Sequence, residues 1–160
     1  MEAFLAEKQN LKQGILPVDF NAAQAGERIS LKKGQRLAIV CSLAASAASV
    51  VSPTLKQHNA AVGGTSKDLS VANPYYHKVD TATSYTKVEP TAPAANYVLT
   101  SLLDTKKGIV IFEVLAEDLD VNADFDHVSI EFASTTVAKL GSVVYQLHDC
   151  KNLPAYTESV

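Results

Sequence analysis

Oxygen-bearing side chains recur at every second position of one segment, residues 117–126, which we call the acidic link. They are Asp118, Asp120, Asn122, Asp124 and Asp126. Carboxylate and amide oxygens at alternating positions are typical of the opening of a Ca²⁺-binding loop. The link is therefore a weak candidate metal site, whose ligands would be Asp118, Asp120, Asn122 and Asp124.

The rest of the link departs from the calcium pattern. Ala123 stands where the loop needs a glycine for its sharp turn, and Ser129 stands where it needs a bidentate glutamate. No helix is predicted on either side. The alternative is a solvated, charged turn that also blunts pairing at a sheet edge. We therefore predict no bound metal and no cofactor.

Other catalytic patterns are missing from the sequence. No two of the four histidines have the spacing of metal ligands on one element, and no serine stands in a GxSxG elbow. A triad assembled from distant segments stays open, because triads are recognised by geometry. The prediction is a protein that is not an enzyme.

Apolar residues alternate with polar ones on both sides of the acidic link, which is typical of half-buried strands. Val110, Phe112 and Val114 share one face before the link, and Val128, Ile130 and Phe132 share one face after it. A further strand is predicted over 35–44. It is apolar on both faces, so we expect it to be buried on both sides.

About nine short strands are expected, with turn signals at roughly ten-residue spacing. This predicts a mainly β, single-domain protein: an antiparallel β-sandwich or a jelly-roll-like barrel. Residues 1–26 are predicted to be an N-terminal arm, with a short helix over 3–11 as one option. Residues 27–152 would form the β domain and 153–160 a C-terminal tail.

Composition disfavours several partners. The net charge is −3, and there are only two arginines against twelve lysines, so nucleic-acid binding is not expected. No apolar run approaches the roughly 20 residues that span a bilayer. The N-terminal residues lack the pattern of a secretion signal. The protein is expected to fold in a cytoplasm.

Surface contact is the remaining kind of function. Residues 52–61 have strand length without a clear apolar face, so we predict an edge strand that accepts a neighbour's strand. Exposed tyrosines would add aromatic contact area, although tyrosines also cap the ends of many β-sandwiches. The predicted interface residues are Phe4, Leu5, Leu11, Phe20, Thr54, Lys56, His58, Tyr75, Tyr76 and Tyr85.

Several segments, in order, resemble a family of small head proteins of tailed bacteriophages, which includes head decoration (cement) proteins. They are FNAAQAGERISLKKGQRLAIV at 20–40, TLKQHNAA at 54–61, NPYYHK at 73–78, SYTKVEP at 84–90, VIFEVLAEDLDVNADFDHVSIEFA at 110–133 and KLGSVVYQLHDCKN at 139–152. The combination is more specific than any one segment, and together they cover half of the chain. The family has no catalytic motif to carry over.

The resemblance implies a virion protein on the capsid exterior that binds the major capsid protein and stabilises the head. Symmetric capsid sites favour a symmetric homo-oligomer, for which a trimer is the expectation. The alternatives are a head-completion or tail-tube component, and a host- or glycan-binding β-sandwich module.

Overall fold

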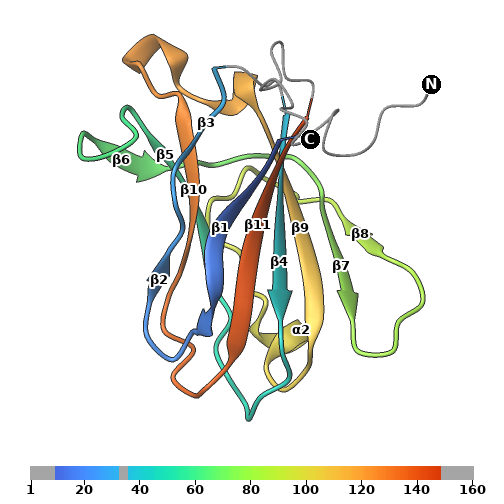
Figure 1. Cartoon of the computed structure of the whole chain (residues 1–160). Helices are drawn as coiled ribbons and strands as arrows, with labels where there is room; N and C mark the ends of the chain where they lie inside the picture. The colour runs from blue at the N-terminus through green and yellow to red at the C-terminus, as the bar shows by residue number, and fades with distance from the viewer. Residues whose placement is uncertain (1–9, 33–35, 149–160) are drawn as a thin grey trace, which may run out of the picture.

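Two antiparallel β-sheets pack face to face in the computed structural model, which describes residues 10–32 and 36–148 (Figure 1). The prediction of a mainly β, single-domain sandwich is confirmed. None of the helices in the described ranges is long and apolar enough to cross a membrane.

Six strands, drawn side by side in Figure 1, form the larger sheet in the order β1-β11-β4-β9-β7-β8. Their bounds are β1 Asn10–Asp19, β11 Leu140–His148, β4 Arg36–Leu43, β9 Gly108–Leu115, β7 Tyr75–Val79 and β8 Thr86–Val88. β7 and β8 pair with each other as an antiparallel hairpin.

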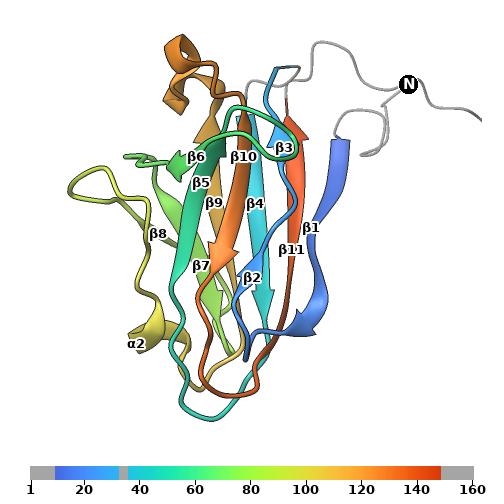
Figure 2. The ribbon, with the colours of Figure 1, turned by 90° about the vertical axis from the view of Figure 1, so that its left-hand side faces the viewer.

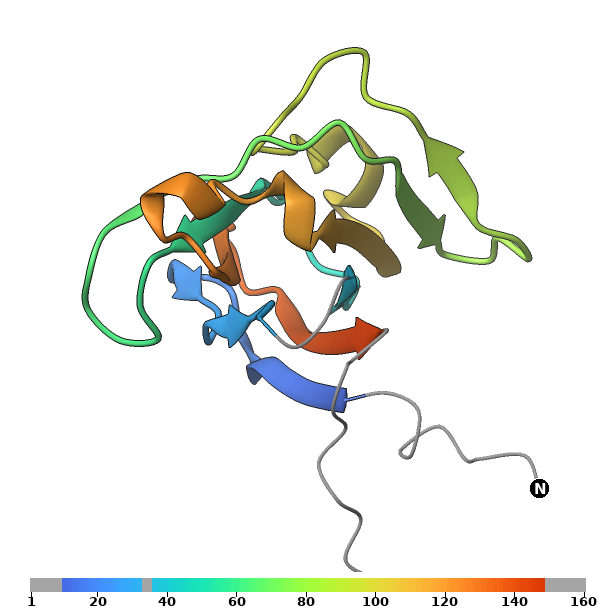
Figure 3. The ribbon, with the colours of Figure 1, turned by 90° about the horizontal axis from the view of Figure 1, so that it is seen from above.

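The smaller sheet lies in front in Figure 2, in the order β2-β10-β5-β6, with β3 also paired to β10. Its bounds are β2 Gln24–Ala25, β3 Ile29–Ser30, β5 Pro53–His58, β6 Ser66–Asp68 and β10 His127–Phe132. Three single-turn helices connect strands: α2 Thr100–Leu103, η1 Ala116–Asp118 and η2 Val121–Ala123. Figure 3 shows both sheets from above, with the β7–β8 hairpin extending to one side.

Apolar side chains at every second position of the strands fill the space between the sheets, as the sequence predicts. Leu37, Ile39 and Cys41 of β4 are buried there, opposite Val128 and Ile130 of β10. Successive side chains of a strand point to opposite faces, so every second residue of each strand contributes to one shared core.

Tyr145 of β11 connects the two sheets through this core. The side chain is fully buried, and its hydroxyl oxygen accepts a hydrogen bond from the backbone N–H of Ile130 in β10, at 3.2 Å. Two glycines make room for the ring. A Cβ on Gly14 would lie 2.7 Å from the tyrosine Cζ, and one on Gly26 would lie 2.5 Å from the hydroxyl oxygen.

The prediction of an arm over 1–26 is wrong for its described part. Residues 10–19 form β1, which pairs with β11, and Phe20 is fully buried. The backbone N–H of Glu27 donates to the carbonyl oxygen of Gly14 at 2.8 Å and ties β1 to the start of the smaller sheet. Residues 1–9, with Phe4 and Leu5 and most of the optional helix, lie outside the described residues, as does the tail at 153–160.

The prediction of an edge strand at 52–61 is also wrong. β5 pairs with β10 on one side and with β6 on the other, and Thr54 also bridges to Asn96.

Candidate protein-interaction surface

The outer face of the smaller sheet is polar and satisfied within the chain. Lys56 lies 2.6 Å from a carboxylate oxygen of Asp68, and Asn96 donates to the hydroxyl of Thr54 at 2.8 Å. His58 is buried between two serine hydroxyls, Ser66 at 2.6 Å and Ser129 at 2.8 Å. The polar side chains of this face therefore already have hydrogen-bond or ion-pair partners within the chain, and few are left to bind another protein.

The outer face of the larger sheet is different, because an apolar row crosses four of its strands. Val144 pairs with Val40, Val40 with Ile111, and Ile111 with Tyr76. Directly paired residues lie on the same face of a sheet, and this face is opposite the core. All four side chains are half-buried, and no element of the described chain packs across them as a third layer (Figure 3).

Further apolar side chains extend this row into what we call the outer face. Ile109 lies next to Ile111 on this face of β9, and Leu115 lies beyond Glu113, while Leu11 and Leu140 are 49% and 62% exposed. Contiguous exposed apolar surface is typical of sites of protein contact. The outer face is thus the best candidate for an interaction surface.

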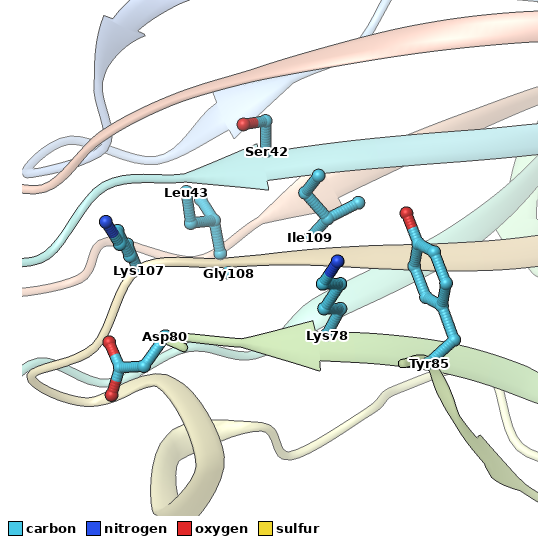
Figure 4. A pocket seen from close by; sticks show the side chains of 8 residues that line it. All are labelled: Ser42, Leu43, Lys78, Asp80, Tyr85, Lys107, Gly108 and Ile109. Carbon is cyan, nitrogen blue, oxygen red and sulfur yellow. The ribbon is translucent and has the colours of Figure 1, made fainter. Parts of the chain in front are cut away.

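A hollow of about 280 Å³ lies at one end of the outer face, where the β7–β8 turn meets the start of β9 (Figure 4). Lys78 extends between Ile109 and Tyr85, and its ammonium nitrogen lies 5.9 Å from the centroid of the tyrosine ring. Lys107 and Asp80 stand at the other end of the hollow.

Lysines at this hollow lack the partners that the other described lysines have. Lys78 and Lys107 in its lining, and Lys106 beside it in the chain, make no salt bridge with any described carboxylate. The lysines that do are Lys12, Lys32, Lys56, Lys67 and Lys87. The described ammonium groups that are free to meet an external anion are therefore gathered at one end of the molecule.

A buried lysine, Lys139, braces the turn that carries Lys107. Its ammonium group donates to the carbonyl oxygens of Leu103 at 2.8 Å and Lys106 at 3.2 Å, and to the hydroxyl of Ser46 at 3.1 Å. Burial lowers the pKa of Lys139, and the nearby carboxylate of Asp104 only partly opposes this shift. No local pattern in the sequence indicates this role.

Changing Lys139 to methionine is expected to lower the free energy of unfolding by about 1–2 kcal/mol, because two carbonyl groups lose their donor. Chemical denaturation would measure the change. Lys106→Met is the matched control, since the exposed Lys106 side chain has no such bonds and its loss should change stability little. Equal stability of the two variants would contradict the bracing role.

The predicted interface residues divide between the faces. Leu11, Tyr76 and Tyr85 lie on the outer face or its hollow, and Thr54 and Lys56 lie on the polar face. Tyr75 packs inward, with its ring 5.4 Å from Tyr97 and 5.7 Å from Phe112 between centroids. Phe20 and His58 are buried inside the domain, so their assignment to an interface is wrong.

The predicted metal ligands of the acidic link face separate partners. Asp118 accepts from the backbone N–H of Leu115 at 2.7 Å and from the amide of Asn73 at 2.6 Å. Asp120 lies 2.5 Å from Lys67, and this hydrogen-bonded ion pair holds the pKa of Asp120 below its usual value. Asn122 and Asp124 are exposed. Across the ranges 10–32 and 36–148, no group of three or more His, Cys, Asp or Glu side chains is placed to hold a metal ion.

Comparison with known proteins adds little to this geometry. No family model and no curated protein matches the sequence. The crystal structure of the SPBc2 prophage-derived protein YomS is similar at a TM-score of 0.38 and 8% identity, over 86% of this chain and 92% of that one. A likeness at this level carries no argument about what this chain does.

Proposed function

We propose that this protein is a structural component of a phage virion that binds the outer surface of the major capsid lattice and stabilises the head. The observation that carries the proposal is the apolar row across the outer face of the larger sheet, which no described element covers. A protein of this kind needs a rigid fold and a surface matched to its neighbours, with no catalytic role. The resemblance of six sequence segments to phage head proteins supports the same function.

Binding to an assembled lattice stabilises it by mass action, because a ligand of the assembled state alone shifts the equilibrium toward that state. The effect is repeated at every occupied site, so a modest interface is enough. A symmetric oligomer, for which we propose a trimer, would suit the symmetry of lattice sites. The net charge of −3 suits the outside of a shell better than contact with packaged DNA.

Two lysine substitutions on the outer face, Val144→Lys and Ile111→Lys together, are expected to weaken binding to purified heads at least tenfold. Each adds a charge where apolar contact is proposed, and long lysine side chains can reach solvent in the free protein. Co-sedimentation with heads that lack this protein would measure binding. The matched control is Thr54→Lys on the polar face, with melting temperatures recorded for all variants.

The number of copies per purified head separates the alternatives. Decoration predicts tens to hundreds of copies per head, whereas a head-completion or tail-tube component predicts few. A tube component should also assemble into rings or tubes by itself, and a glycan-binding module should be retained on a sugar array. Densitometry that finds a handful of copies per head would overturn decoration.

A further inference from the structure

We propose that the hollow at the end of the outer face is a docking site for an aspartate or glutamate side chain, presented by an extended, otherwise apolar segment of the partner protein. The inference rests on the proposed function and names the partner chemistry at that surface. The hollow combines unpaired positive charge, apolar surroundings and a fixed backbone.

The lining of the hollow carries unpaired positive charge. Lys78 and Lys107 line the hollow without a described carboxylate within salt-bridge distance, and Asp80 is the only acid in the lining. The lining therefore has an excess of positive charge that is not neutralised within the described chain. Carboxylates make stronger hydrogen bonds to ammonium groups than neutral acceptors do, and a bond shielded from water gains further.

Apolar side chains also line the hollow and lie next to the apolar row. Ile109 and Leu43 line the same hollow, and Tyr85 forms one wall. Ile109 pairs with Lys78 and lies two residues before Ile111 on β9, which belongs to the apolar row. Two residues of extended chain span about 7 Å. A segment with an acid in the hollow would therefore place an apolar side chain two residues away against the row.

The backbone around the hollow is held in place before any partner arrives. The N–H of Asp80 donates to the carbonyl oxygen of Lys107 at 2.9 Å, and the N–H of Ala82 closes the hairpin turn on Val79 at 3.1 Å. Lys139 braces the turn from the core side. Such preorganisation lowers the entropy that binding must overcome.

The hollow is large enough for a single carboxylate-bearing side chain. Its volume of about 280 Å³ is below the usual range of small-molecule sites, about 300–1,000 Å³. One carboxylate-bearing side chain needs only part of this space.

The test neutralises both lysines, Lys78→Gln and Lys107→Gln, in the full chain. We expect about tenfold weaker binding to purified heads, and a wild-type affinity that falls as salt rises. The matched control, Lys32→Gln and Lys67→Gln, removes the same charge near the acidic link and should bind within about threefold of the wild type. Binding of the hollow variant equal to that of the control would overturn the docking site and leave the proposed function standing.

A second measurement works without heads. A capped Val-Glu-Val-Glu-Val peptide should shift the methyl signals of Ile109 in the NMR spectrum of the wild type, and the peptide with glutamine in place of glutamate should not. Equal shifts with both peptides, or none with either, would overturn the carboxylate site. Failure of the wild type to bind heads, with the peptide result intact, would instead overturn the proposed function.

Discussion

Replacing Tyr145 with alanine is expected to lower the free energy of unfolding by about 3–5 kcal/mol, as is typical for removing a large buried aromatic side chain. The ring is fully buried between the sheets, and its hydroxyl satisfies the backbone N–H of Ile130. The loss thus combines a cavity with an unpaired buried donor. Denaturant titration monitored by circular dichroism would measure it.

Two further variants separate the contributions. Tyr145→Phe keeps the ring and should cost about 1–3 kcal/mol for the unsatisfied N–H of Ile130. Tyr76→Ala is the matched control, because that tyrosine lies half-buried on the outer face and leaves the core intact. A Tyr145→Ala variant as stable as Tyr76→Ala would show that the contact between the sheets does not depend on this ring.

The strands beside the acidic link could be predicted because each has one buried face. Val110, Phe112 and Val114 alternate with half-buried residues in the structure, and Val128, Ile130 and Phe132 are buried as a set. The alternation of apolar and polar residues in the sequence predicts such strands directly. β4 has a second apolar face at Ala38 and Val40, from which burial on both sides is predicted. Ala38 is buried, but Val40 is half-buried and no described element covers it. The spacing of apolar residues shows that a strand face is apolar. It does not show whether another part of the same chain covers that face.

β1 was mistaken for part of an arm because its alternation is broken. Its pairing with β11 shifts register between Gln13 and Ile15, and again between Ile15 and Val18. Gly14 and Pro17 at these irregularities look like terminators of structure in a sequence. The glycine is instead required by the ring of Tyr145, which comes from a strand far along the chain. Contacts between distant segments of this kind leave no local pattern.

β5 was mistaken for an edge strand because its outward residues are polar. Those residues find partners that are distant in sequence: His58 with Ser129, and Thr54 with Asn96. A polar strand face can therefore belong to the interior of a sheet when its hydrogen bonds are satisfied across strands. The hollow was missed for a related reason, since Lys78 and Lys107 are brought together only by the pairing of β7 with β9.

Acid is expected to destabilise the fold through His58, by at most about 3 kcal/mol. Burial lowers the pKa of His58 from its ordinary 6.5 to about 4, and the positive charges of Arg28, His127 and Lys56 add to the shift. Between these two values the unfolded chain takes up a proton that the folded chain does not. Stability contributed by neutral His58 is therefore present above pH 6.5 and is lost as the pH falls toward 4.

The free energy of unfolding of His58→Gln, measured at pH 7, 5.5 and 4.5, should fall less steeply with acid than that of the wild type. Glutamine can still bond the hydroxyls of Ser66 and Ser129, and it has no proton to gain. His77→Gln, at a half-buried histidine of β7, should retain the wild-type slope. The difference between the slopes of the wild type and His58→Gln reports the buried histidine. Identical slopes in His58→Gln and the wild type would mean that the site between the hydroxyls of Ser66 and Ser129 accepts a charged imidazole. Acid would then destabilise the fold through other groups.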